Sequence, residues 1–195
     1  MDKGKIIVLA APSGCGKSTI INALVDQGDL NLGFAVSATT RPPRQGEEHG
    51  VNYYFMSEDE FRDAISEDEF VEYEEVYPGR LYGTLRSEID RITGQGHNII
   101  LDLDVNGALR VKDLYGPEAL IVFIAPPSIA ELRRRLESRG TESAANIDER
   151  IDRAEYEISK ASAFDRQVVN DDLVTAIRQT RNLIDGFLTL SGAPV

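Results

Sequence analysis

Short apolar runs alternate with amphipathic segments along this chain. The runs Ile6–Ala10 and Leu120–Ile124 are apolar at every position, Ile99–Leu101 is a shorter run, and Gln167–Val169 is a weaker one. Strands that are apolar on both faces and are separated by helices are typical of a mostly parallel sheet covered by helices. The pattern therefore predicts an α/β fold in three layers around a central parallel sheet.

Helix signals occupy the stretches between these runs. Residues 18–25 are predicted to form a helix that ends before Gly28. Ser57 and Ser128 are each followed three positions later by a glutamate, which is the spacing of a capping box. Toward the end of the chain, apolar residues recur at helical spacing, at Leu173, Ile177, Leu183, Ile184 and Phe187.

The middle of the chain departs from the strand–helix alternation. Residues 34–84 hold short apolar segments, a Pro-Pro turn and an acidic helix, so they are predicted to form an inserted α+β lobe. Residues 129–160 are polar and helical and are predicted to form a lid. Because no repeat or linker marks a boundary, residues 1–195 are predicted to be one domain, with a core of residues 1–33, 85–128 and 161–195.

The composition favours a folded protein with small ligands over one that binds polymers. The chain has 195 residues, of which 42% are hydrophobic and 28% are charged, and this argues against disorder. Its net charge of −12 disfavours nucleic-acid polymers and anionic membranes as partners. The charge is unevenly spread, because residues 58–76 contain ten acids and one base and leave the rest at about −3.

The numbers of cysteines and histidines and the lengths of the apolar runs further limit the class of protein. The chain has one cysteine, which excludes an intramolecular disulfide framework. It has only two histidines, so a zinc cluster is disfavoured. No apolar run approaches the roughly 18 residues that a membrane span requires. We therefore predict a cytoplasmic enzyme or binding module, as a monomer or homodimer.

The strongest local motif follows the first predicted strand directly. Residues Ala11–Ser18 have the pattern of a phosphate loop and open a helix, with Ala11 where the pattern has glycine. Gly14 and Gly16 permit backbone conformations in which successive N–H groups point into one concavity, at the positive end of a helix. Lys17 is expected to reach the β- and γ-phosphates, and the Ser18 hydroxyl to bind Mg²⁺. The predicted triphosphate-binding residues are Ala11, Pro12, Ser13, Gly14, Cys15, Gly16, Lys17 and Ser18.

Cys15 lies inside this loop at a helix N-terminus, where the pKa of a thiol is expected to fall. Two interpretations are open. Cys15 is either a redox-sensitive switch or a small residue that fills a variable position of the motif.

Two arginines three positions apart, Arg41 and Arg44, lie in a loop stiffened by Pro42 and Pro43. Guanidinium groups match the oxygens of a phosphomonoester two at a time, and the prolines limit the entropy lost on ordering. These residues alone leave two interpretations open, a phosphate-binding loop and a set of surface ion pairs.

The sequence around these arginines closely resembles the guanylate kinase family. The resembling stretch runs from Ser37 to Phe55, and further matching runs are Phe70–Tyr73, Tyr82–Thr84, Leu101–Asp104 with Gly107, Leu132–Gly140 and Val169–Asp172. The resemblance extends from Ile6 to about Asp172. It implies reversible, ATP-dependent phosphorylation of GMP and dGMP in purine nucleotide metabolism and GMP recycling, with Mg²⁺ as the cofactor.

The resemblance also implies roles for individual residues. The ligands of the GMP phosphate would be Ser37, Arg41, Arg44, Tyr53 and Tyr82. The residues that read guanine would be Glu72, Thr84 and Asp104, with Asp102 nearby in the GMP site. The catalytic cations would be Lys17, Arg41, Arg135, Arg139 and Arg150, of which the last three belong to the lid. Asn170 would contact the adenine of ATP.

Asp102 has two candidate roles, because it follows a predicted buried strand beside the phosphate loop. It either holds Mg²⁺ through water, together with Ser18, or is a structural carboxylate that pairs with an arginine. Arg133 and Arg134 are expected to be solvated helix residues. No general base is evident, which suits a reaction governed by positioning and electrostatics.

Two other functions are compatible with parts of the sequence. A non-catalytic scaffold domain would have a degraded phosphate loop, whereas Lys17 and Ser18 are present. A kinase for AMP, a pyrimidine monophosphate or a sugar phosphate would not require Glu72, Thr84 and Asp104. In the favoured interpretation the inserted lobe and the lid close on the substrates and exclude water.

Overall fold

The computed structural model of this protein describes residues 3–138 and 144–190. The chain forms two compact units, one of Met1–Ile6 with Gly33–Ile99 and one of Ile7–Leu32 with Ile100–Val195. Within the described residues, no helix is both long and apolar enough to cross a membrane. In chain order the elements are β1 (Ile6–Ala10), α1 (Lys17–Asp26), β2 (Leu32–Phe34), β3 (Ala38–Thr39), β4 (Tyr54–Phe55), α2 (Glu58–Ser66), β5 (Phe70–Tyr77), β6 (Arg80–Leu85), α3 (Arg86–Gly94), β7 (Asn98–Leu103), α4 (Val105–Tyr115), η1 (Gly116–Glu118), β8 (Ala119–Ala125), α5 (Ile129–Ser138), α6 (Ala144–Ser159), η2 (Ala161–Ala163), β9 (Arg166–Val169) and α7 (Leu173–Leu190).

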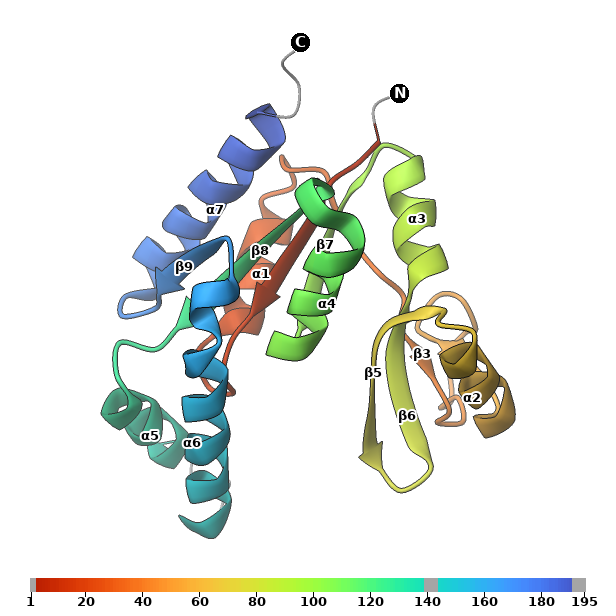
Figure 1. Ribbon diagram of the computed structural model, residues 1–195, viewed down its shortest axis with the longest axis horizontal. Helices are drawn as coiled ribbons and strands as arrows, with labels where there is room; N and C mark the ends of the chain where they lie inside the picture. The colour runs from red at the N-terminus through yellow and green to blue at the C-terminus, as the bar shows by residue number, and fades with distance from the viewer. Residues whose placement is uncertain (1–2, 139–143, 191–195) are drawn as a thin grey trace. The chain divides into compact units, whose positions relative to one another are not determined.

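The larger sheet has five strands in the order β2-β7-β1-β8-β9. Strands β8 and β9 pair in parallel, with Val122 opposite Arg166 and Ala125 opposite Val169. Helix α4 covers one face of this sheet, and α1 and α7, which pack together, cover the other (Figure 1). The predicted α/β fold with a central parallel sheet is confirmed, and the four apolar runs that predicted strands lie in β1, β7, β8 and β9.

Burial explains why these runs are apolar throughout. Every residue of β1 is buried, and β8 is buried from Ala119 to Ile124. A strand covered by helices on both faces has no solvent side on which polar residues would be favourable. The core of this unit continues into α1, where Ile20, Ile21 and Leu24 are buried on one face.

The smaller sheet has four strands in the order β4-β3-β6-β5. Helix α2 begins with the predicted capping box, because the Ser57 Oγ accepts from the Glu60 N–H over 3.2 Å and the Glu60 Oε2 accepts from the Ser57 N–H over 2.7 Å. Its Phe61 stacks on Phe70 of β5 with the ring centroids 4.3 Å apart. These residues form a separate small core together with Ala38 and Leu81.

The apolar run Phe34–Ser37, predicted as part of the inserted lobe, does not form one strand. Strand β2 ends at Phe34 in the five-stranded sheet, and β3 begins at Ala38 in the four-stranded sheet. The N–H of Val36 donates to Glu88 over 3.2 Å instead of to a neighbouring strand. Glu88 is buried, and the Tyr54 hydroxyl also donates to it over 3.0 Å, so the buried carboxylate has hydrogen-bond partners.

Candidate functional site

The phosphate loop, residues Ala11–Ser18, connects the end of β1 to the start of α1. Gly14 and Gly16 have φ angles of 93° and 81°, in the left-handed region that glycine adopts without strain. Gly16 caps α1, and its carbonyl accepts from the Ile20 N–H over 3.1 Å. The sequence-predicted loop is therefore formed as a strand–loop–helix unit, with the helix N-terminus at Lys17.

Conformation requires glycine at these two positions, and the space around them also disfavours a side chain. A Cβ atom on Gly14 would lie 2.9 Å from the Leu136 Cδ2, and one on Gly16 would lie 2.6 Å from the Asn170 Nδ2. Distances under about 3 Å for carbon and nitrogen are repulsive, so the neighbouring side chains would have to move. Helix α5 and the segment after β9 thus pack closely against the loop.

The loop forms one wall of the phosphate cavity, which has a volume of about 540 Å³ and is lined by Ala11–Thr19, Asp102, Asp104, Arg150, Arg153 and Glu157. Lys17 projects from the start of α1, where its Nζ lies 2.5 Å from the Asp102 Oδ1 and donates to the Leu103 carbonyl over 2.6 Å. The Ser18 hydroxyl donates to the Asp102 Oδ2 over 3.3 Å. Lys17, Ser18 and Asp102, all predicted site residues, are therefore brought together.

Helix α6 also contributes side chains to the lining of this cavity. The Arg150 guanidinium donates to the Ser13 hydroxyl over 2.8 Å, which ties the predicted lid arginine to the phosphate loop. Arg153 and Glu157 also line the cavity, although neither is predicted as a site residue from the sequence. They lie three and seven positions after Arg150, on the same helix face. This spacing is the sequence feature from which a position beside Arg150 could have been predicted.

Glu157 is the most unusual carboxylate of this cavity, because it is only 6% exposed. Burial raises the pKa of Glu157, since a charged carboxylate loses solvation there. The Arg153 Nε donates to its Oε1 over 3.1 Å and compensates part of that loss.

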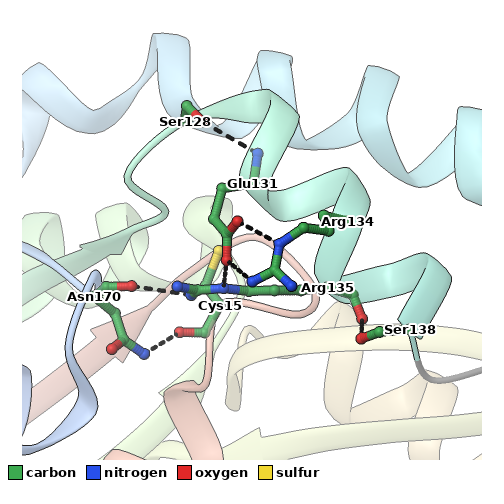
Figure 2. A network of polar contacts seen from close by, with 7 residues as sticks. All are labelled: Cys15, Ser128, Glu131, Arg134, Arg135, Ser138 and Asn170. Atoms are coloured by element: carbon green, nitrogen blue, oxygen red, sulfur yellow. Dashed lines mark hydrogen bonds and ion pairs between the residues drawn. The ribbon is translucent and has the colours of Figure 1, made fainter.

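A polar network connects α5 to the phosphate loop (Figure 2). The Arg135 guanidinium donates to the Glu131 Oε1 and to the Asn170 carbonyl, each over 2.9 Å. The Asn170 Nδ2 in turn donates to the Cys15 carbonyl over 2.7 Å. Two predicted residues, Arg135 and Asn170, are thus joined to each other and to the loop.

The Glu131 carboxylate binds arginines of this network and does not complete the predicted capping box with Ser128. Ser128 accepts from the Glu131 N–H over 3.1 Å, which is half of the predicted box. The Glu131 carboxylate turns to Arg134 and Arg135, because two guanidinium groups attract it more strongly than a neutral N–H. These hydrogen bonds lower the pKa of Glu131 to about 2. Arg134 is otherwise 71% exposed, as expected, and Arg133 pairs with Asp148 at 2.7 Å.

The expected fall in the pKa of Cys15 is wrong. The Cys15 side chain is 1% exposed and packs in the apolar core together with Leu132 and Leu136 of α5. Burial raises the pKa of this thiol to about 12, which outweighs the opposing effect of Arg135. The geometry favours the interpretation of Cys15 as a small residue that fills the loop.

In the other unit, the Arg41 side chain is nearly buried and is held on several sides. Its guanidinium donates to the Glu47 Oε1 over 2.9 Å and to the Pro42 carbonyl over 2.8 Å. The same group lies 5.3 Å from the ring centroid of Tyr53. The hydrogen bond to Glu47 raises the pKa of Arg41, and an interaction with Tyr82 adds to this effect. Arg41, Tyr53 and Tyr82 thus form one cluster, whereas Arg44 is exposed and contacts Glu47 through its backbone N–H.

Two of the predicted guanine-reading residues meet on neighbouring strands. Glu72 of β5 and Thr84 of β6 are opposite each other in the antiparallel pair, and the Thr84 hydroxyl donates to the Glu72 Oε1 over 2.7 Å. Ser37 precedes β3, and its carbonyl accepts from the Tyr54 N–H over 2.9 Å.

The remaining predicted residues have different positions. Asp102 and Asp104 belong to the unit that holds the phosphate loop, where Asp104 caps α4 by accepting from the Gly107 N–H over 2.7 Å. Among the described residues Asp102 forms its ion pair with Lys17. The alternative in which it is a structural carboxylate predicted an arginine as the partner. Arg139 lies outside the described residues.

A parallel sheet, a loop with two left-handed glycines and a lysine at the first position of the following helix define a P-loop nucleotide-binding protein. A sequence model of the family described as guanylate kinase matches residues 3–186. The chain therefore belongs to the guanylate kinase family and is a nucleotide kinase.

Individual relatives agree with this assignment. A guanylate kinase from Porphyromonas gingivalis is 53% identical over 184 residues, which cover 94% of this chain and 98% of the relative. A guanylate kinase from Bacteroides fragilis is 52% identical over 186 residues, with 95% of this chain and 91% of the relative covered. The crystal structure of guanylate kinase from Anaplasma phagocytophilum has a TM-score of 0.68 and 32% identity, and the match covers 95% of this chain and 87% of that one.

Proposed function

We propose that this chain transfers the γ-phosphoryl group of ATP to GMP and dGMP, reversibly, and so serves purine nucleotide metabolism and GMP recycling. Family membership supports the reaction, and the contact between Thr84 and Glu72 carries the choice of base. The Thr84 hydroxyl donates to the Glu72 Oε1 over 2.7 Å, which fixes the carboxylate in position. Guanine has N–H donors at N1 and N2 that one carboxylate accepts together, whereas adenine has an acceptor at N1.

The acceptor phosphate is proposed to bind at the Arg41 cluster. Arg41 is held by Glu47 and lies against Tyr53, so little side-chain entropy is lost when a phosphate binds. Ser37, Arg44 and Tyr82 are proposed to complete this phosphate site. A guanidinium that is oriented in advance binds a phosphate dianion with two parallel hydrogen bonds.

ATP is proposed to bind in the phosphate cavity. Backbone N–H groups of the phosphate loop would donate to the phosphates, with Lys17 and Arg150 beside them; the Cys15 N–H is excepted, because it donates to the Pro12 carbonyl over 3.2 Å. A neighbouring cavity of about 320 Å³, lined in part by Arg135, Asn170 and Leu173, is the proposed adenine site. The transition state of phosphoryl transfer spreads negative charge over the transferred oxygens, so fixed cations lower the barrier without a general base. Lys17, Arg41, Arg135, Arg139 and Arg150 are proposed as these cations.

Ser18 of α1 and Asp102 of β7 fit a magnesium ion. The Ser18 Oγ and the Asp102 Oδ2 are 3.3 Å apart in the wall of the phosphate cavity. Hydroxyl and carboxylate oxygens are the ligands that Mg²⁺ prefers, and water commonly supplies others. Bound Mg²⁺ would supply charge neutralisation on the phosphates, while Lys17 and Arg150 orient them.

A substrate panel tests this proposal. ADP release in the presence of Mg²⁺-ATP is measured with GMP, dGMP, AMP, CMP and UMP as acceptors. We expect rapid turnover of GMP and dGMP and slow turnover of the other three, because only guanine satisfies Glu72. Comparable turnover of AMP would contradict the proposal. We further propose that the protein acts in the cytoplasm, where its substrates are found, as a monomer or homodimer, which size-exclusion chromatography resolves.

A further inference from the structure

Three charged residues of α6 face the phosphate cavity together. Arg150, Arg153 and Glu157 all line it, and their spacing of three and four positions places them on one face of the helix. Arg150 contacts the phosphate loop through Ser13. Arg153 is the next residue along this face, one helical turn further, and has no role in the site described above.

A buried carboxylate holds the Arg153 side chain in this position. The Glu157 side chain is 9% exposed, and its Oε1 accepts from the Arg153 Nε over 3.1 Å. The Arg153 side chain is 58% exposed, so the guanidinium is anchored at one edge and accessible to a ligand. Its Nη2 lies 3.9 Å from the Asp104 Oδ2, which also lines the cavity. A guanidinium has five N–H donors in a fixed fork, so it can contact a carboxylate and a phosphate at once.

Arg153 balances the negative charge of the acidic side chains that line the cavity. The cavity wall holds three cations, Lys17, Arg150 and Arg153, and three acids, Asp102, Asp104 and Glu157. Without Arg153 the acids would outnumber the cations around a ligand that is itself strongly anionic. Unbalanced like charge inside a partly enclosed site opposes binding, because solvent screens it less than at an open surface.

We propose that Arg153 is a further binding residue for the triphosphate of ATP, held by Glu157 and replacing its distant contact with Asp104 by one with a phosphate oxygen. The identity of the nucleotide rests on the proposed function. The contact between Arg153 and the triphosphate rests on the cavity alone. Arg153 therefore acts mainly on ATP affinity, and the Arg41 cluster proposed for the GMP phosphate, which does not include Arg153, keeps its contacts.

The test compares Arg153→Gln with Arg153→Lys and with Arg178→Gln, which removes an exposed arginine from α7. Isothermal titration calorimetry measures the Kd for a non-hydrolysable ATP analogue with Mg²⁺ at two salt concentrations. We expect Arg153→Gln to raise this Kd roughly tenfold and to weaken its salt dependence, since a charged hydrogen bond to phosphate is lost. Arg153→Lys should recover part of the loss, and Arg178→Gln should bind like the wild type.

Two further readouts separate this role from a structural one. Circular dichroism should show that Arg153→Gln is folded at the assay temperature, with a lower unfolding midpoint because Glu157 loses its partner, and its KM for GMP should remain within about twofold. Wild-type affinity for the ATP analogue in Arg153→Gln would overturn the proposal, as would an equal loss of GMP affinity. A wild-type protein that binds the ATP analogue but does not phosphorylate GMP would refute the proposed function and leave the result on Arg153 standing.

Discussion

The Nζ of Lys17 lies 2.5 Å from the Oδ1 of Asp102, so the lysine that opens α1 is held by the residue near the end of β7. The other carboxylate oxygen of Asp102 accepts from the Ser18 hydroxyl over 3.3 Å. One carboxylate therefore touches both side chains that a P-loop protein uses on its phosphates and its metal ion. Since the partner of Asp102 is Lys17 and not an arginine, the roles to separate by experiment are holding Mg²⁺ and positioning Lys17.

Replacing Asp102 by Asn tests whether this carboxylate holds Mg²⁺. The amide keeps the shape of the side chain but loses its charge, so the Mg²⁺ concentration for half-maximal activity should rise about tenfold at fixed ATP. The measurement is initial rate against Mg²⁺ concentration. Asp113→Asn, which alters an exposed acid on α4, is the control and should leave the curve unchanged. An unchanged Mg²⁺ midpoint with a reduced kcat would instead assign Asp102 to the positioning of Lys17 alone.

Replacing Glu72 by Gln should reduce the preference for guanine. The amide can accept only one of the two N–H groups that guanine presents, and its own NH₂ opposes the other. We expect kcat/KM for GMP to fall about 100-fold, with a smaller change for AMP, so that the ratio of the two values declines. The matched control, Glu67→Gln, changes an exposed acid at the end of α2 and should retain the ratio. If Glu72→Gln discriminates GMP from AMP as well as the wild type does, another group reads the base.

Features encoded in contiguous residues could be predicted from the sequence. The phosphate loop is one short segment whose glycines and lysine determine its conformation locally, and the apolar runs are long enough to mark β1 and β8. The capping box at Ser57 is local as well. In each case the physical cause lies within a few positions of the residue that shows it.

Features that depend on tertiary packing could not be predicted in this way. The sequence placed Cys15 at a helix N-terminus, but only the fold shows that Leu132 and Leu136 of α5 share its core. The sequence shows Arg153 and Glu157 only as two charged residues of a polar helix, and the fold is needed to show that they line the phosphate cavity. The hydrogen bonding of the Glu131 carboxylate likewise depends on Arg135, whose guanidinium is oriented by its hydrogen bond to the Asn170 carbonyl.

The buried thiol of Cys15 should be unreactive in the folded protein. Burial raises its pKa to about 12, so at pH 8 almost none is thiolate, and alkylation by iodoacetamide should be far slower than for a free cysteine. Mass spectrometry of the native and the urea-unfolded protein measures the two rates. Rapid labelling of the native protein, without loss of its folded circular dichroism signal, would contradict this assignment.

The same burial predicts a dependence of stability on alkaline pH. The folded-state pKa lies above the ordinary value of 9.0, so the neutral thiol stabilises the fold below pH 9 and this contribution is lost as pH rises toward about 12. The free energy of unfolding of the wild type should therefore decline relative to Cys15→Ala between pH 8 and pH 10.5. A constant difference between the two proteins over this range would show that the thiol titrates alike in the folded and unfolded chains.

Two glycine-to-alanine substitutions should have opposite effects on stability. Gly16 has a φ of 81°, and a Cβ there would lie 2.6 Å from the Asn170 Nδ2, so Gly16→Ala should cost about 1–3 kcal/mol. Gly186 lies inside α7, and a Cβ there would meet nothing within 4 Å. Gly186→Ala should therefore stabilise the protein by about 0.5–1 kcal/mol, because alanine restricts the unfolded chain and favours the helix.

Urea denaturation of both variants measures these changes, and titration with the ATP analogue shows their effect on the site. Gly16→Ala should lose ATP-analogue affinity as well as stability, since the loop N–H groups can no longer converge while Asn170 is displaced. Gly186→Ala should bind like the wild type, because α7 contributes to the fold at that position and not to the phosphate cavity. Wild-type stability and affinity in Gly16→Ala would mean that the loop binds phosphates without the left-handed conformation described for it.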